Sequence, residues 1–217
     1  VCRVKCTPSI KSLLTGANTM STRMQNLIEN MGGVVRVEEK PFAPLSREIM
    51  SKYLDVDKKE FSDYLDYLTC FGGETYLNEI FYKLTMYNDG LPIYCYPSES
   101  PVENVVIKNG EFGCFYGEGS SYQTGYLLSN AIKRMENRIP MNFLPIAENN
   151  YGDRICLCVE GERMGKIYYW YHGNEWDEED YCDDFGETMP EEVKMQNMYL
   201  IGENLYDCFK RMVLVEE

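Results

Sequence analysis

Residues 143–171 read FLPIAENNYGDRICLCVEGERMGKIYYWY. This stretch contains three short apolar runs rich in β-branched and aromatic residues, which are 143–147, 154–159 and 166–171. Turn-forming residues separate the runs, at 149–152 in the first connection and at 161–165 in the second. Strands joined by such short turns pair with their neighbours in the chain. We therefore predict a three-stranded meander.

The sequence before this meander carries mostly helical patterns. Met24, Leu27, Ile28 and Met31 recur at helical spacing behind a capping box formed by Thr22 and Gln25. Further capping residues and apolar stripes follow. We predict helices over about 22–31, 46–54, 57–71 and 76–87, and one short strand at 34–37.

Strands dominate from position 93 onward, with one helix between them and one at the end. Besides the meander, the predicted strands are 93–96, 102–107, 112–116 and 199–201. A capping box at Ser120 and Gln123 opens the inserted helix, and residues 205–212 form the last one. We predict a long loop or insertion over 172–194. Segregated helices and strands without a separating linker indicate one α+β domain.

Residues 1–19 differ from the rest, because they contain three bases, no acid and no sustained periodicity. We expect them to be an added or upstream tail before a natural start at Met20 or Met24. We identify no secretion signal and no apolar run that approaches the ~18 residues of a membrane-spanning helix.

Acidic residues are concentrated in one part of the chain. The formal net charge is −14, and residues 171–192 contain ten acids and no Lys or Arg. Nucleic acids and anionic membranes bind proteins through clustered cations, so the composition disfavours both as partners. Basic proteins remain suitable partners.

The nine cysteines and the single histidine, His172, suggest neither a metal site nor a catalytic centre. No C-x-x-C pair occurs, and several cysteines lie in apolar strings such as Ile155–Val159. Buried thiols acting as small apolar residues in a reducing cytoplasm are the expected explanation. We predict no catalytic residues, no metal ligands and no cofactor.

Several segments, taken in order along the chain, resemble the SUKH superfamily, which includes immunity proteins of bacterial toxin systems and a yeast regulator of cell-wall synthesis. The resemblance covers about 76–212. Its strongest segment is Arg138–Leu157, which contains Leu144-Pro-Ile-Ala147, and Gly165–Trp170 followed by His172 is the next. Tyr171 replaces an aspartate usual in the family. The resemblance also matches 76–92 to a family helix ending in a turn, with Asp89 in place of a glycine.

The resemblance implies one domain with a twisted, largely antiparallel sheet flanked by helices, and no catalysis. We accordingly divide the chain into the tail 1–19, a helical N-terminal extension 20–75 and a SUKH-like α+β domain 76–217. The implied function is a cytoplasmic, bacterial immunity-type protein that occludes a basic cognate toxin. A scaffold or regulatory interaction module is the alternative.

We expect partner binding at the acidic stretch, where aromatic residues inside a charged rim are typical of interface anchors. The predicted binding residues are Glu175, Trp176, Asp177, Glu178, Glu179, Asp180, Tyr181, Asp183, Asp184 and Phe185. A solvated loop without a role is the competing interpretation. Less favoured alternatives are a metal site at Asp177–Asp184, a glycosidase carboxylate pair, and a cysteine nucleophile that uses His172.

Overall fold

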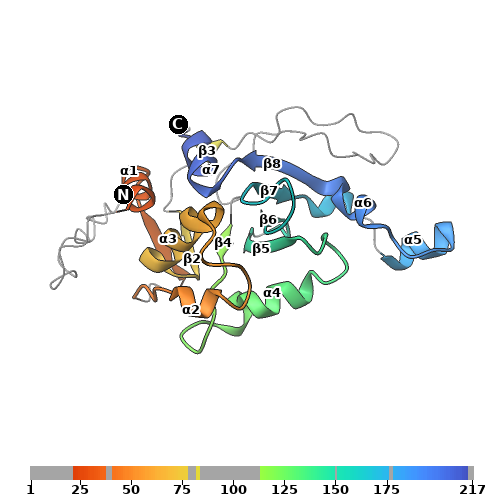
Figure 1. Cartoon of the computed structure of the whole chain (residues 1–217), viewed down its shortest axis with the longest axis horizontal. Coiled ribbons are helices and arrows are strands. Elements are labelled where there is room, and N and C mark those ends of the chain that lie inside the picture. Colours follow the sequence, from red (N-terminus) through yellow and green to blue (C-terminus); the bar gives the residue numbers. More distant parts are fainter. Residues whose placement is uncertain are drawn as a thin grey trace, which may run out of the picture.

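The computed structural model describes residues 22–37, 41–77, 82–83, 113–149, 151–175 and 178–214. Within these ranges, seven strands form one sheet, in the order β1-β2-β4-β5-β6-β7-β8, and all neighbouring strands are antiparallel (Figure 1). The strands are β1 Val34–Arg36, β2 Thr75–Leu77, β4 Cys114–Phe115, β5 Phe143–Glu148, β6 Arg154–Cys158, β7 Ile167–Trp170 and β8 Met198–Gly202. Two short strands, β3 Tyr82–Lys83 and β9 Val213–Leu214, pair separately.

The predicted meander is confirmed as β5, β6 and β7. Leu144 pairs with Leu157 between β5 and β6, and Ile155 pairs with Tyr169 between β6 and β7. Every residue of β6 and β7 is buried. Strands that are buried on both faces require cover on both sides of the sheet.

Side-chain alternation divides these strands between two apolar clusters. Ile155 and Leu157 belong to the larger cluster, whereas Cys156 and Cys158 belong to the smaller one. The larger cluster includes residues of the helices α1, α3 and α7, and the smaller one includes Met135, which follows α4. The buried thiols predicted from the sequence are therefore part of the core, where they fill space as small apolar groups.

The helices follow several of the predicted patterns. They are α1 Arg23–Asn30, α2 Arg47–Met50, α3 Ser62–Phe71, α4 Leu128–Arg134, α5 Glu178–Phe185, α6 Glu191–Lys194 and α7 Leu205–Arg211. Thr22 caps α1 by accepting a hydrogen bond from the Gln25 N–H at 3.1 Å, as the sequence predicts. Among the described helices, none combines the length and the apolar character needed to cross a bilayer.

Both parts of the chain on either side of residue 75 contribute to one core. β1 comes from the predicted N-terminal extension and pairs with β2. Arg36 of β1 forms a buried ion pair with Glu74, with 2.9 Å between Nη2 and Oε2. The predicted α+β fold in one domain is therefore confirmed.

The predicted helix over 76–87 is wrong where the structure describes it. Thr75–Leu77 form β2 and Tyr82–Lys83 form β3. Gly72 has a φ of +75° and Glu74 a φ of +53°, so the chain reverses after α3 and enters the sheet. Pairing with β1 and β4 outweighs the helical spacing of the apolar residues. The remainder of this segment, the predicted strands 93–96 and 102–107, and the tail 1–19 lie outside the described residues.

Other predicted boundaries also need correction. The acidic stretch 172–194 is not one long loop, because it contains α5 and α6. The predicted box at Ser120 and Gln123 does not cap α4, which begins at Leu128 after a 3-10 turn over Thr124–Tyr126. The Gln123 N–H donates instead to the Glu74 carboxylate. The helix predicted over 57–71 begins later than expected, because α3 starts at Ser62 after a 3-10 turn over Lys59–Phe61.

Candidate functional site

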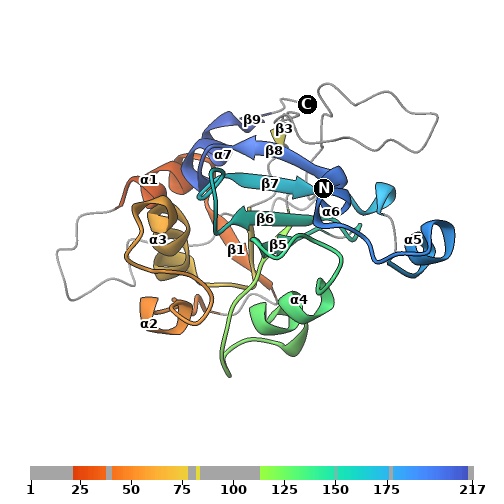
Figure 2. The same ribbon diagram turned by 45° about the vertical axis from the view of Figure 1, so that its right-hand side comes forward.

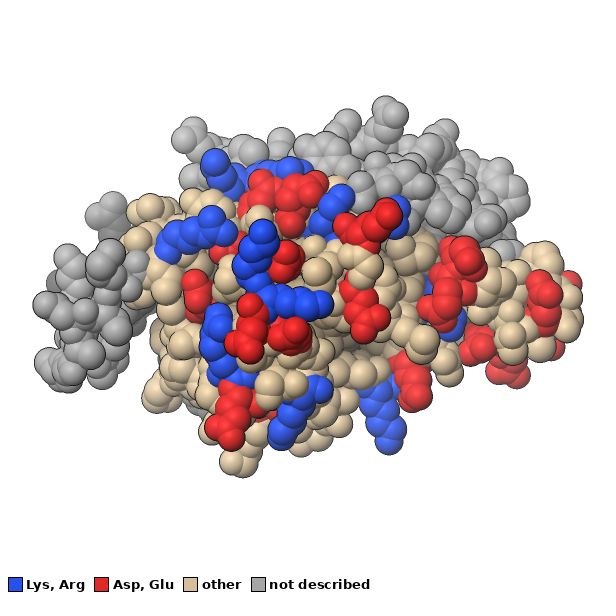
Figure 3. Space-filling model, in the orientation of Figure 1, with Lys and Arg blue, Asp and Glu red and all other residues tan. Residues whose placement is uncertain are grey.

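The acidic helix α5 lies at one end of the molecule, away from the sheet, in both ribbon views (Figures 1 and 2). Glu179, Asp180, Asp183 and Asp184 are exposed, and Glu178 is half-buried. Asp and Glu side chains dominate this end of the face in view (Figure 3). Trp176 and Asp177 of the predicted site lie outside the described residues.

The acidic residues at the two ends of α5 have opposite effects on helix stability, because they interact differently with the helix dipole. Glu178, Glu179 and Asp180 occupy the first turn, where acidic side chains stabilise a helix. Gly186, with a φ of +73°, follows the helix, and its N–H donates to the Cys182 carbonyl at 2.7 Å. Asp183 and Asp184 lie in the last turn, where negative charge is unfavourable. Helix stability therefore does not account for these two carboxylates.

The two described aromatic residues of the predicted site have different surroundings. Tyr181 is buried and packs with Met189 and Val193, which attaches α5 to α6. Phe185 is 54% exposed, although its ring centroid lies 4.5 Å from that of Tyr181. Tyr181 is therefore a structural anchor, whereas Phe185 presents apolar surface beside the exposed carboxylates.

Glu175 is turned toward the body of the protein. Its two carboxylate oxygens accept hydrogen bonds from Arg138 Nε at 2.5 Å and Nη2 at 2.6 Å. The Arg138 guanidinium also lies over the Trp170 ring, 5.3 Å from its centroid. The structure thus separates Glu175 from the exposed acids, and this residue fixes the point where the acidic segment leaves the sheet.

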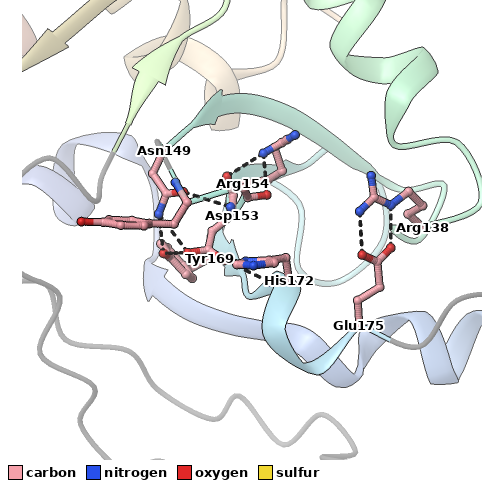
Figure 4. A network of polar contacts seen from close by, with 9 residues as sticks. Arg138, Asn149, Asp153, Arg154, Tyr169, His172 and Glu175 are labelled. Carbon is pink, nitrogen blue, oxygen red and sulfur yellow. Dashed lines mark hydrogen bonds and ion pairs between the residues drawn. The ribbon is translucent and has the colours of Figure 1, made fainter.

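A buried polar network holds the strand ends just before this exit (Figure 4). Asp153, the residue before β6, accepts hydrogen bonds from the Tyr169 hydroxyl and from Asn149 Nδ2, the latter at 2.9 Å. The His172 backbone N–H donates to Asp153 Oδ1 at 3.0 Å, and His172 Nδ1 lies 2.6 Å from the same oxygen. Asn149 Oδ1 closes the preceding turn by accepting from the N–H groups of Tyr151 and Asp153, each at 2.9 Å.

This hydrogen-bond network lowers the pKa of Asp153. Burial alone raises the pKa, but hydrogen bonds from Tyr169, His172 and Asn149 outweigh burial, so the pKa lies below its usual value. The carboxylate is thereby held in its charged form. His172 therefore has a structural hydrogen-bonding role, at the point where the chain leaves β7 and enters the 3-10 turn His172–Asn174.

Three cysteine thiols, one half-buried and two buried, do not resemble activated nucleophiles. Burial raises the pKa of Cys114 to about 12, and it also raises the pKa values of Cys156 and Cys208. These thiols stay protonated at neutral pH, whereas a cysteine nucleophile needs a lowered pKa. In the part of the chain that the structure describes, no group of three His, Cys, Asp or Glu residues could hold a metal ion.

Arg138 and Asp153 hold the segment that leads to α5, and the sequence patterns did not predict this role. Arg138 lies 37 residues from its partner Glu175, and Asp153 lies 19 residues from His172. Neither separation in sequence corresponds to the period of a helix or a strand, so hydrophobic periodicity could not predict either contact. The turn residues 149–152 were the available clue, since an Asn that starts a turn before an Asp often bonds to its own backbone.

Comparison with known families identifies one match. The model of the SUKH_6 family, described as SMI1-KNR4 cell-wall, matches residues 61–187, more than half of the chain. The matched range extends from the end of the 3-10 turn before α3 through α5, so it includes both the meander and the acidic helix. No curated protein and no solved structure gives a significant match.

Proposed function

The chain belongs to the SUKH_6 family, described as SMI1-KNR4 cell-wall, and on this premise we propose that it is a non-catalytic immunity-type protein. It binds a cognate toxin domain and neutralises it by stoichiometric occlusion. The contact surface is α5, and the partner is a basic protein domain. Binding requires no cofactor and no turnover.

One observation carries this proposal. α5 lies away from the sheet and carries exposed carboxylates together with the exposed ring of Phe185. Charged groups steer a basic partner toward such a surface, and a desolvated aromatic residue then supplies contact area. The last-turn acids, Asp183 and Asp184, are unfavourable for the helix itself, which supports a role in binding.

The proposal that the protein is non-catalytic is supported by the polar groups near β6, because they hydrogen-bond to one another. Asp153 and His172 bond to each other, and Tyr169 and Asn149 donate to the same carboxylate. The six described cysteines are free, which supports a reducing cytoplasm as the compartment.

Affinity capture from a lysate of the source cell tests the proposal. We expect one basic toxin domain, retained in a one-to-one ratio, weakened by salt, and identified by mass spectrometry. The activity of that toxin, titrated with this protein, should disappear at one equivalent. A captured partner whose activity persists at several equivalents would contradict occlusion.

A regulatory scaffold is the second candidate, and the family description favours it by naming the cell wall. A scaffold should retain several partners at unequal and weaker occupancy. Capture of such a set, with no single stoichiometric partner, would replace the immunity assignment with this one.

A further inference from the structure

An open groove lies between the turn at 140–142 and α6. Its volume is about 530 Å³, and its lining includes Met141, Met195, Glu160, Glu191 and Glu192. α6 is the helix to which Tyr181 attaches α5, through Val193. One wall of the groove is therefore joined to the proposed contact surface through the packing of Tyr181 on Val193.

Two methionine side chains give the groove an apolar surface, and a backbone hydrogen bond fixes the chain at one of them. Met141 is 88% exposed, and its backbone N–H donates to Glu191 Oε2 at 3.2 Å. This bond ties the 140–142 turn to α6. Met195 contributes a second, half-buried thioether side chain. Methionine side chains adapt their shape to a ligand, so two of them suit an apolar group of variable form.

The charged residues that line the groove, Glu160, Glu191 and Glu192, are all acidic. Glu191 is paired with Lys194, with 2.8 Å between Oε1 and Nζ. Glu160 and Glu192 form no ion pair with any residue in the ranges that the structure describes. No Lys or Arg belongs to the described lining of the groove. An occupant with one positive charge and an adjacent apolar group would match both features.

We propose that this groove binds an arginine or lysine side chain of the partner protein, with a neighbouring apolar residue packed on Met141 and Met195. This inference rests on the proposed function, because it adds a second contact to the α5 surface. It specifies the chemistry of the partner: an exposed basic residue next to an apolar one.

Methionine-methyl NMR of the full chain tests the proposal. The probe is acetyl-Leu-Arg-amide, and acetyl-Leu-citrulline-amide is the uncharged control. We expect saturable shifts of the Met141 and Met195 methyl signals with the arginine probe. Met24 and Met50, which are buried in the larger cluster, should not move. The citrulline probe should bind about tenfold more weakly, because it lacks the charge.

Two variants separate this inference from the proposed function. Glu160→Gln with Glu192→Gln should weaken the arginine probe by about tenfold and leave the spectrum of the buried methionines unchanged. Glu179→Lys with Asp183→Lys, on α5, should leave probe binding at wild-type strength. Absent shifts, or equal shifts with both probes, would overturn the groove assignment. If the probe binds but no toxin is captured, the groove assignment stands and the proposed immunity function is contradicted.

Discussion

Asp153 shows how one carboxylate can fix the position of a surface segment. Its oxygens accept from Asn149 in the preceding turn, from Tyr169 in β7 and from His172 after β7. It is 4% exposed, so unpaired donors or acceptors here would have no water to replace these bonds. The turn at 149–152 was predicted from residue types, but its connection to β7 required the sheet register.

Replacing this carboxylate by an amide should destabilise the protein in a pH-dependent way. Asp153→Asn removes the charge that accepts these bonds, and we expect a loss of about 2 kcal/mol at pH 7. The folded pKa of Asp153 is lowered, so its contribution is present above the unfolded pKa and is lost as the pH falls through the folded pKa. Urea unfolding at pH 7 and at about pH 3 measures this difference.

Tyr169→Phe is the matched control, because it removes one donor and keeps the charge. It should cost about 1 kcal/mol at pH 7. If Asp153→Asn cost the same at both pH values, the carboxylate charge would not be the stabilising feature.

At the scale of elements, local signals predicted some segments and failed for others. The meander was predicted because its strands are joined by short turns and pair with sequence neighbours. The helix predicted over 76–87 failed because β2 pairs with β1, about 40 residues earlier, and with β4. Helical spacing in an apolar segment does not show such distant partners.

Gly72 controls the chain reversal into β2, and substituting it should be costly. A Cβ at this position would overlap the Ala43 carbonyl, and the φ of +75° disfavours any other residue. We expect Gly72→Ala to cost at least about 3 kcal/mol. Gly33→Ala is the control, since its φ is +83° but a Cβ would meet nothing within 4 Å. It should cost about 1 kcal/mol, the left-handed penalty alone. Similar costs in urea unfolding would refute the proposed clash.

Tyr181 and Phe185 should separate the stability of α5 from its proposed binding role. Tyr181→Ala removes the contact with Met189 and Val193, so hydrogen exchange over 178–185 should accelerate while the core strands stay protected. Phe185→Ala should leave that exchange unchanged and weaken capture of the partner, because this ring is exposed. Loss of protection in both variants would show that Phe185 is structural as well.

At the scale of the whole molecule, the sequence predicted the α+β class and the family, and the family match over 61–187 bears out both. It also located the acidic segment but predicted a loop there. Composition showed the charge of residues 171–192 without showing that Glu175 is paired with Arg138 or that Tyr181 is buried. Those distinctions depend on contacts between distant residues, which charge and periodicity do not encode.

The central claim is that α5 binds a basic partner through its exposed acids. Glu179→Lys with Asp183→Lys reverses two exposed charges four residues apart on α5, one in its first turn and one in its last. The opposite effects on the helix dipole should nearly cancel, so the melting temperature should change by only a few degrees. Glu29→Lys with Glu48→Lys makes the same charge change on exposed residues of α1 and α2, away from α5.

The most direct measurement is the affinity of both variants for the captured partner, by calorimetry at low salt. We predict that the α5 variant binds about a hundredfold more weakly, whereas the control stays within about threefold of the wild type. Equal affinities for the two variants would contradict binding through α5. The acidic residues of α5 would then be a solvated surface without a binding role.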